Sequence, residues 1–150
     1  MKVNIRHLLV IGAVTMTGLF QFGCTAQAGQ QAVSDGVFVH ISTGPEQPHK
    51  VLMGLKMAEL MSEDHDVLVY MDVNGILDVL KDGPNLKKEP FGYSHDIIKE
   101  LVSRGVPVYA CPGCMKSFGK TKDDLLPGVQ VAEKKGFFDF TRGRILTIDY

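Results

Sequence analysis

The chain has 150 residues, of which 45% are hydrophobic and 22% are charged, and its formal net charge is −1 at pH 7. This length supports one domain with a substantial hydrophobic core and leaves little room for a second. Acidic and basic residues are mixed along the chain, so there is no basic patch of the kind that holds a nucleic acid. We therefore expect one globular domain without a nucleic-acid partner.

The first 28 residues have the layout of a secretory signal. Lys2 and Arg6 form a positively charged start, an apolar stretch follows from residue 8 to residue 20, and small residues come next. The apolar stretch is too short to span a bilayer comfortably as a permanent helix. The sequence therefore predicts that residues 1–28 are a targeting segment and that the protein is exported to the periplasm.

Two cleavage points compete at the end of this segment. Cleavage before Cys24 would make this cysteine the lipidated N-terminus of a lipoprotein, although such signals usually have leucine where this chain has Gln21. Cleavage after the Ala-Gln-Ala sequence at 26–28 would leave Gly29 first, as in ordinary secretion. We favour the lipoprotein, because a lone cysteine directly after the apolar stretch otherwise has no role. The lipid would be the only membrane contact, and the protein would face the periplasm from the outer membrane.

The rest of the chain divides into a short polar linker at 29–35 and a domain at 36–150. Short apolar runs of the kind that form buried strands alternate with segments of helical pattern. We expect the strands at 37–41, 67–71, 106–110, 129–131 and 145–148, and the helices at 49–62, 76–80, 94–104 and 112–118. Residues 134–141 are expected to be a short helical or irregular piece. This alternation predicts an α/β fold with a parallel sheet.

Three local features add detail to this interpretation. Residues 84–93 have no periodicity and are predicted to form an exposed loop. Ser94 stands where the N-cap of the next helix is expected. Phe137, Phe138 and Phe140 are predicted to pack under the sheet, because large aromatic side chains bury much apolar surface.

The motif Cys111-Pro112-Gly113-Cys114 stands directly after the strand expected at 106–110. If Cys111 is the N-cap of the following helix, Pro112 occupies the first helical position, where its missing N–H is tolerated. The amides of Gly113 and Cys114 then point back at the Cys111 sulfur. A free cysteine has a pKa of about 8.5, and C-x-x-C settings lower it to roughly 3.5–7.5. We therefore expect Cys111 to be a reactive thiolate.

Apart from Cys24, the pair Cys111 and Cys114 provides the only thiols of the chain. A disulfide across a two-residue gap constrains very little of the unfolded chain, so a functional role explains the pair better than a structural one. Three roles are compatible with it. They are the binding of sulfane sulfur on Cys111 with Cys114 as the resolving thiol, the exchange of dithiol for disulfide, and a metal-binding or structural role in an oligomer.

A metal site would need ligands from elsewhere, because one C-x-x-C pair supplies two of the four that a closed zinc site requires. The histidines that could complete such a site are His40, His49, His65 and His95, and none of them stands at a ligand spacing in the sequence. We therefore expect no resident metal within one chain and no other cofactor, and the metal-binding alternative would need a subunit interface that brings two cysteine pairs together.

Several polar side chains are expected near Cys111, because the carboxyl ends of parallel strands meet at one edge of a sheet. Two of them, Asp72 and Asn74, follow the strand at 67–71, and three lie at or after the end of the strand at 37–41, namely His40, Ser42 and Thr43. We predict that these five side chains line a pocket around the cysteine.

Four stretches of the sequence together resemble the DsrE/DsrF/YchN-like family. They are residues 48–81, the turn Arg104-Gly105-Val106-Pro107-Val108, the cysteine motif with Gly119 eight places after Cys111, and Leu126-Pro127-Gly128-Val129 before the last strand. The similarity extends from Gly36 to Tyr150, and it rests on the order and spacing of these stretches.

The resemblance implies a three-layer α/β/α sandwich with a five-stranded, mainly parallel sheet, and assembly into homo-oligomers that are trimers or hexamers. It also implies that the cysteine after the third strand, here Cys111, takes sulfur from a donor protein as a persulfide and passes it to an acceptor, as a carrier or a sulfurtransferase. Well-known relay members are cytoplasmic and often have one cysteine in the motif, whereas this chain has an export signal and also Cys114. A thiol three residues away can attack a persulfide on Cys111, which releases sulfide and leaves a disulfide.

Overall fold

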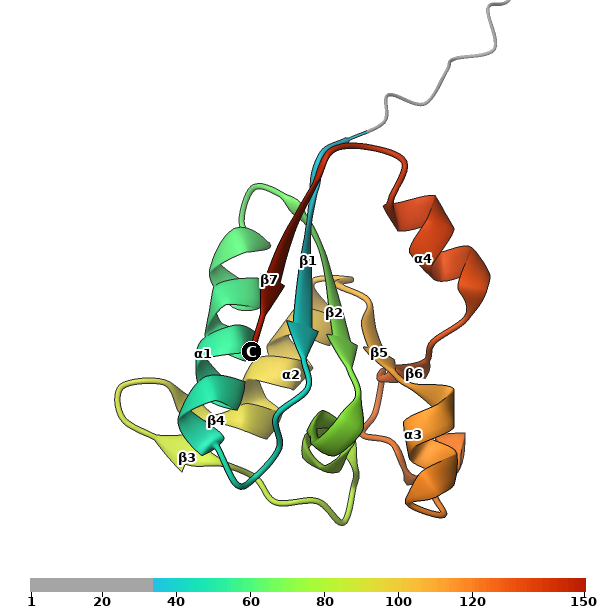
Figure 1. Ribbon diagram of the computed structural model, residues 1–150. Helices are drawn as coiled ribbons and strands as arrows, with labels where there is room; N and C mark the ends of the chain where they lie inside the picture. The colour runs from blue at the N-terminus through green and yellow to red at the C-terminus, as the bar shows by residue number, and fades with distance from the viewer. Residues whose placement is uncertain (1–33) are drawn as a thin grey trace, which may run out of the picture. The chain divides into compact units, whose positions relative to one another are not determined.

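The computed structural model describes residues 34–150 (Figure 1). The predicted signal at 1–28, with Cys24, and nearly all of the predicted linker at 29–35, with Gly29, lie outside the described residues. Within residues 34–150, no helix has the length and apolar character that a membrane span requires.

Five parallel strands form the central sheet, in the order β6-β5-β2-β1-β7 (Figure 1). The strands are β1 (Gly36–Ile41), β2 (Asp66–Met71), β5 (Val108–Ala110), β6 (Gln130–Val131) and β7 (Ile145–Asp149). The two longest, β1 and β2, lie in the interior of the sheet and are nearly continuous apolar runs, as expected of strands covered on both faces. The prediction of a parallel α/β sheet is confirmed.

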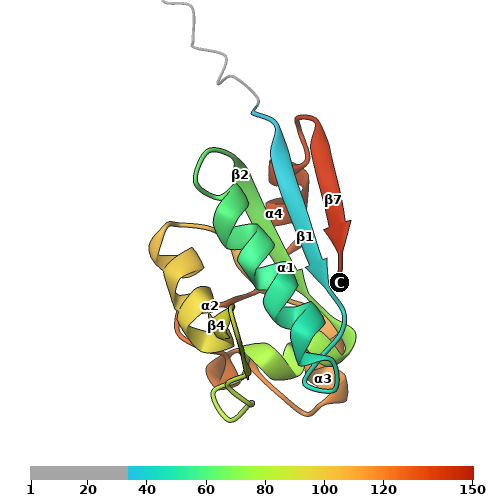
Figure 2. The ribbon, with the colours of Figure 1, turned by 90° about the vertical axis from the view of Figure 1, so that its left-hand side faces the viewer.

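The helices form a layer on each face of this sheet (Figures 1 and 2). The chain moves in one direction across the sheet from β1 to β2 to β5, and right-handed crossovers therefore place α1 (Pro48–Met61) and α2 (Ser94–Ser103) on the same face. The return from β6 to β7 runs the opposite way, so α4 (Lys134–Phe140) covers the other face. The expected three-layer sandwich is confirmed, with α4 as a short third layer.

The hydrophobic core lies between the sheet and the pair α1 and α2. Alternate residues of each strand face it, because successive side chains point to opposite sides of a sheet. These residues are at most 3% exposed, and so are those of the helices that meet them, namely Val37, Val39, Ile41, Val67, Val69, Met71 and Val108 from the strands and Val51, Leu52, Leu55, Ala58, Ile98 and Leu101 from the helices. Because these residues are buried in the core, the alternate residues between them point to the opposite face of the sheet.

An aromatic cluster occupies the opposite face, where α4 packs. The Phe137 ring centroid lies 5.0 Å from that of Tyr70, 5.9 Å from that of Tyr109 and 6.1 Å from that of Phe38. Phe138, in contrast, is 62% exposed. The expectation that Phe138 also packs under the sheet is therefore wrong, because neighbouring residues of a helix point in different directions.

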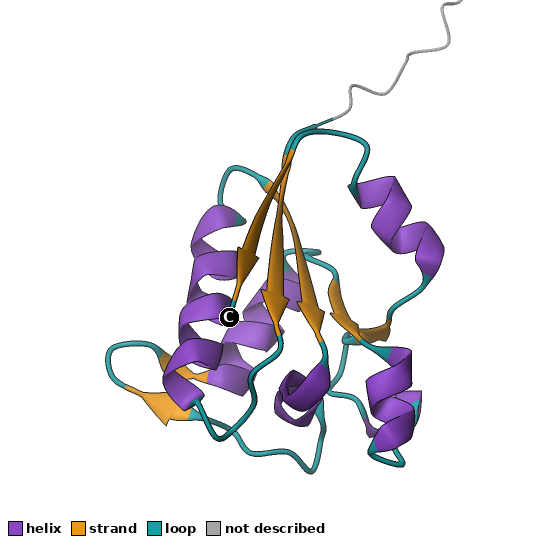
Figure 3. Ribbon diagram, viewed as in Figure 1, coloured by secondary structure: helices purple, strands orange, loops and turns teal. Residues whose placement is uncertain are grey.

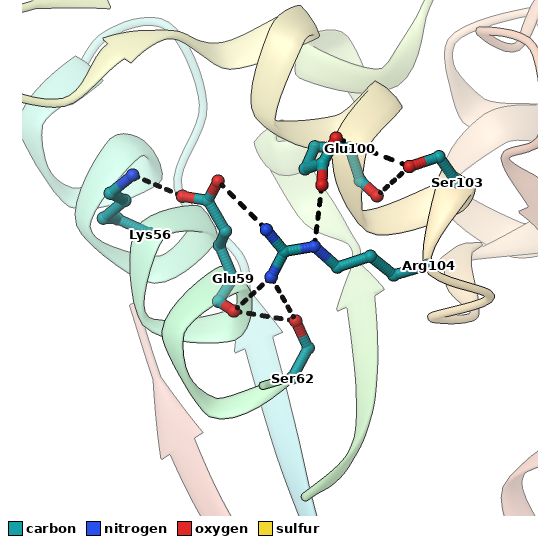
Figure 4. A network of polar contacts seen from close by, with 6 residues as sticks. All are labelled: Lys56, Glu59, Ser62, Glu100, Ser103 and Arg104. Atoms are coloured by element: carbon teal, nitrogen blue, oxygen red, sulfur yellow. Dashed lines mark hydrogen bonds and ion pairs between the residues drawn. The ribbon is translucent and has the colours of Figure 1, made fainter. Parts of the chain in front are cut away.

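Arg104 joins the C-terminal ends of α1 and α2 (Figure 4). Its guanidinium donates to the Glu100 carboxylate at 2.8 Å, to the Glu59 carbonyl at 3.1 Å and to the Ser62 hydroxyl at 3.2 Å. Glu59 also forms an ion pair with Lys56. These contacts fix α2 against α1 immediately before the chain enters β5, the strand that leads to the cysteines.

The segment before α2 differs from its prediction. Instead of an irregular loop, residues 84–93 contain a small antiparallel hairpin of β3 (Lys87–Lys88) and β4 (Gly92–Tyr93), drawn in orange in Figure 3. Ser94 is not the N-cap, because Tyr93 has that position and Ser94 is the first helical residue. The Ser94 hydroxyl is buried and accepts a hydrogen bond from the Leu86 amide at 2.9 Å, so its role is to tie this segment to α2.

Three short helical segments flank the carboxyl edge of the sheet. They are the 3-10 helix η1 (Val73–Val79) after β2, the α-helix α3 (Pro112–Ser117) after β5, and the 3-10 helix η2 (Lys122–Asp124) before β6. Asp78 of η1 is fully buried, and neither of its carboxylate oxygens has a hydrogen-bond partner within residues 34–150. Burial, together with repulsion from Glu46, raises the pKa of Asp78 to about 7.

We predict that the stability of the fold decreases as the pH rises from about 4 to about 7 and that Asp78→Asn removes much of this decrease. An unfolded aspartate ionises near pH ~3.9, whereas folded Asp78 stays neutral until about pH 7, so ionisation favours the unfolded chain in this window. Above pH 7 the variant should be more stable than the parent by up to about 4 kcal/mol. Urea unfolding at pH 4, 6 and 8 measures this, with the exposed Asp123→Asn as the control, and identical pH profiles for the parent and Asp78→Asn would contradict it.

Candidate functional site

Cys111 lies at the carboxyl edge of the sheet, where β5 ends and α3 begins. It is the N-cap of α3, Pro112 is at the first helical position, and the Cys111 sulfur accepts a hydrogen bond from the Cys114 amide at 3.4 Å. The geometry predicted for the motif is therefore confirmed. Both thiols are free and partly exposed, so they are accessible to reagents and to each other.

One row of side chains crosses the sheet beside this cysteine. The register aligns Asp149 of β7, His40 of β1, Tyr70 of β2, Tyr109 of β5 and Gln130 of β6. Aligned residues of neighbouring parallel strands point to the same face, and here it is the face opposite the main core. Cys111 follows Tyr109 by two residues, so it continues the same face toward the carboxyl edge.

Tyr70 is the member of this row next to Cys111. It pairs with Tyr109, two residues before Cys111, so Tyr70 and Cys111 are diagonal neighbours on one face. Burial together with this neighbour raises the pKa of Tyr70 far above its usual value. Tyr70 therefore remains a proton donor toward the sulfur over the whole physiological pH range. No sequence motif selects Tyr70, which is one residue of an apolar run, and only the strand register shows its position.

The two cysteines have opposite ionisation preferences. Burial works against a charge on Cys111, but the neighbouring Tyr70 side chain and the hydrogen bond from the Cys114 amide outweigh it and lower the pKa of the Cys111 thiol. Burial and the neighbouring Cys111 raise the pKa of the Cys114 thiol. Cys111 is thus the thiol of the pair that ionises more readily, and Cys114 keeps its proton to a higher pH.

The Cys114 sulfur is held by a strained residue. It accepts a hydrogen bond at 3.2 Å from the amide of Val73, the first residue of η1. Val73 has a φ of +44°, in the left-handed region that a β-branched side chain rarely adopts, and its side chain is 54% exposed. Backbone strain of this kind persists only where the surroundings fix it, and it is typical of functional sites.

His40 lies between two carboxylates in the same row. Its Nε2 is 2.9 Å from an Asp72 oxygen and its Nδ1 is 2.8 Å from an Asp149 oxygen. Burial lowers the pKa of His40, but the two carboxylates overcome this and raise it above its usual value. The structure therefore brings His40 and Asp72 together at the site edge, and it adds Asp149, which lies just past the predicted end of the last strand at residue 148.

The remaining candidates have other contacts. The Ser42 hydroxyl donates to the Tyr150 backbone oxygen at 3.3 Å, and the backbone N–H of Asn74 donates to the Ser42 carbonyl at 3.2 Å. The Asn74 side chain helps to lower the pKa of Glu46. Thr43 has a buried hydroxyl without a hydrogen-bond partner in the described part of the chain. No hydrogen bond among residues 34–150 joins these three side chains to either cysteine, so their contacts hold the loop after β1 against η1.

The histidines considered as extra metal ligands are dispersed. His65 pairs with its neighbour Asp64, the His49 ring packs on Phe91 with centroids 5.4 Å apart, and His95 has a buried Nε2. In the part of the chain that the structure describes, no three His, Cys, Asp or Glu side chains are grouped so that they could hold a metal ion.

Two cavities adjoin the site. One, of about 330 Å³, lies beside α3 and is lined by Pro112, Met115 and Lys116 among others. The second, of about 760 Å³, is lined by residues of β5, β6 and α4, including Tyr109. Both cavities share Lys122 and Val131 in their linings, and Pro112 is the one residue of the cysteine motif that lines either of them.

Comparison with known proteins identifies related sequences and folds. The model of the DsrE/DsrF-like family matches residues 35–142, whereas no curated protein matches the sequence. The chain is similar to the YchN protein from E. coli, with 17% identity and a TM-score of 0.62 over 76% of this chain and 99% of that chain. It is also similar to MTH1491, a protein of unknown function from Methanobacterium thermoautotrophicum, with 22% identity and a TM-score of 0.56 over 77% and 99% of the two chains. At these identities the solved structures establish a common fold.

We predict that Cys111 reacts with iodoacetamide at pH 7 about tenfold faster than Cys114, or more, because the thiolate is the reactive form and each pKa unit changes its population about tenfold. Brief alkylation of the reduced protein followed by peptide mass mapping measures both rates. The Cys114→Ser variant serves as the control in which Cys111 should stay reactive. Equal labelling of the two cysteines, or faster labelling of Cys114, would contradict the assignment.

Proposed function

We propose, given that the chain belongs to the DsrE/DsrF-like family, that it handles sulfane sulfur by binding it as a persulfide on Cys111, with Cys114 as the resolving thiol. The observation that supports this most directly is the setting of the Cys111 sulfur, which accepts a hydrogen bond from the Cys114 amide at the start of α3 and lies beside Tyr70 of the adjacent strand. Donors in these positions stabilise a sulfur anion, whether it is the thiolate before reaction or the persulfide after it.

Sulfur uptake is an exchange at a sulfur–sulfur bond. The Cys111 thiolate attacks the outer sulfur of a persulfide or polysulfide donor and forms a new bond to it. The S–S bond of the donor breaks, and the donor leaves as a thiolate or as a polysulfide anion shorter by one sulfur. An acceptor thiolate can then take the outer sulfur by the same reaction, which returns Cys111 to its starting form. This cycle transfers sulfur without any net oxidation, so it needs no cofactor.

Cys114 provides a second outcome. Its sulfur can attack Cys111 and form a disulfide while the outer sulfur leaves as hydrosulfide, which takes the Cys114 proton. An external dithiol must then reduce the pair. The 3.4 Å contact between the Cys114 amide and the Cys111 sulfur keeps the two residues close, and the same proximity favours simple dithiol–disulfide exchange as the alternative function.

We predict that incubation of the reduced protein with polysulfide adds whole sulfur atoms to the chain and that Cys111→Ser abolishes this addition. Cys114→Ser should instead make the adduct longer-lived, because the resolving thiol is gone. Intact mass spectrometry distinguishes the products. If the parent loses only two hydrogens and Cys114→Ser gains no sulfur, the protein is an exchanger of dithiols and the sulfur-handling proposal is wrong.

We also propose that the protein acts in the periplasm, anchored by a lipid on Cys24. The supporting features are the charged start, the apolar stretch and the position of Cys24. The predicted result is that cells labelled with a fatty-acid analogue yield a labelled protein whose N-terminus begins at Cys24, and that Cys24→Ser removes the label. A mature protein that begins at Gly29 in both cases would show ordinary secretion instead.

The proposal extends to assembly into a homo-oligomer, a trimer or a hexamer, that exchanges sulfur with donor and acceptor proteins. Exposed apolar side chains support this assembly, because a group of large apolar side chains on the surface is typical of subunit contacts. On the face formed by α1 and on the edge strand β7 these include Met53 at 40%, Leu60 at 52% and Leu146 at 55% exposure.

A further inference from the structure

Four residues on three adjacent strands form a connected group beside Cys111. Asp149 comes from β7, His40 from β1, and Tyr70 from β2, with Asp72 directly after the end of β2. His40 bonds both carboxylates, and its ring stacks on Tyr70 with centroids 5.8 Å apart and an interplanar angle of 25°. Tyr70 is therefore the member of this group that stands between His40 and Cys111, because it is the register partner of His40 on one side and of Tyr109, two residues before Cys111, on the other.

The two carboxylate contacts determine the protonation of His40. A neutral imidazole has one N–H, whereas an ionised carboxylate only accepts hydrogen bonds. Both ring nitrogens of His40 lie within 2.9 Å of a carboxylate oxygen, an arrangement that favours the imidazolium, in which each nitrogen has a proton to donate. The His40 side chain is 27% exposed and that of Asp72 is 21% exposed, so their contact is shielded from water, whereas Asp149 is 68% exposed.

The Tyr70 ring has little freedom to move. The His40 imidazolium stacks on it, the edge of Phe137 from α4 meets it with centroids 5.0 Å apart, and Phe38 lies at 6.2 Å. A tyrosine ring enclosed in this way keeps its hydroxyl in one direction, and the diagonal neighbour of Tyr70 on this face of the next strand is Cys111. His40 is in turn fixed at both nitrogens, so the chain of contacts runs from two carboxylates through His40 and Tyr70 to the sulfur.

We propose that Tyr70 is a catalytic residue that donates a hydrogen bond to the sulfur anion on Cys111, and that His40, held as an imidazolium by Asp72 and Asp149, is the positioning residue that keeps Tyr70 there. The inference deepens the proposed function. It rests on that function only where the sulfur anion is a persulfide, because the Cys111 thiolate forms without any sulfur donor. A charged ring that is tied to two neighbours holds its place better than a neutral ring tied to one.

The test is the pKa of Cys111, measured from thiolate absorbance in a Cys114→Ser background, where Cys111 is the only thiol that titrates in the domain. Tyr70→Phe keeps the ring and removes the hydroxyl, so it should raise this pKa by about one unit. Tyr109→Phe is the matched control, because Tyr109 is the register partner of Tyr70 on the same face, and it should leave the pKa unchanged. Circular dichroism verifies that each variant is folded.

The positioning role of His40 is tested by asking whether the effect of its substitution depends on Tyr70. His40→Gln should raise the pKa of Cys111 by about half a unit in the parent and not at all in the Tyr70→Phe background, because a residue that acts through another shows no effect once that one is gone. The remote His65→Gln should have no effect in either. An equal His40→Gln shift in both backgrounds, or no shift with Tyr70→Phe, would overturn the inference.

The exposed position of Asp149 provides a milder variant in case Tyr70→Phe does not fold. Asp149→Asn should shift the pKa of Cys111 in the same direction as His40→Gln, and ¹⁵N spectra of His40 should change from the imidazolium toward the neutral pattern. A neutral His40 in the parent at pH 7 would overturn the inference.

These readouts use no sulfur donor, so they are independent of whether Cys111 accepts sulfur. A protein that fails to take up sulfur but shows these shifts would refute the proposed function alone.

Discussion

The register of the parallel strands is the constraint on which the site depends. It aligns His40 with Tyr70 and Tyr70 with Tyr109, and this alignment places a hydroxyl beside Cys111. A slip of one residue would turn the Tyr70 side chain into the core and bring an apolar neighbour to the sulfur. The register is secured by the opposite face of the same strands, where valines such as Val39 and Val69 are fully buried against α1 and α2. Packing on one face therefore determines the chemistry on the other.

The two faces of the sheet are covered unequally, and this has a functional consequence. One face is closed by two helices and is almost entirely aliphatic, whereas the other has only the short α4 and a cluster of aromatic and charged side chains. The thinner cover leaves His40, Tyr70 and Cys111 partly accessible at the carboxyl edge. Their polar groups are paired with one another, as partly buried polar groups must be for the fold to be stable.

Much of the fold could be predicted from the sequence because its signals are local. Continuous apolar runs indicate buried strands, and the order of strands and helices indicates a parallel sheet. The N-cap position of Cys111 also follows from a few adjacent residues. Ser94 and Phe138 were predicted wrongly because their roles depend on partners outside their own segments, the Leu86 amide in one case and the orientation of α4 in the other.

The candidate site could be predicted only in part, for the same reason. His40 and Asp72 follow from the rule that the ends of parallel strands meet, and they do lie together. Tyr70 and Asp149 depend on the register between strands that are far apart in the chain, which no motif records. Val73 has a backbone conformation that valine rarely adopts, so the sequence gives no reason to predict this conformation or a role for Val73 in the site.

The central claim is that Cys111 holds a sulfur anion and that this anion is the form in which sulfur is accepted. The most direct test is tandem mass spectrometry of the protein taken from the cells that make it, with thiols trapped during lysis. The account predicts peptides in which Cys111 has one additional sulfur atom and Cys114 has none. Peptides in which Cys111 occurs only as an unmodified thiol or in a disulfide with Cys114 would contradict it.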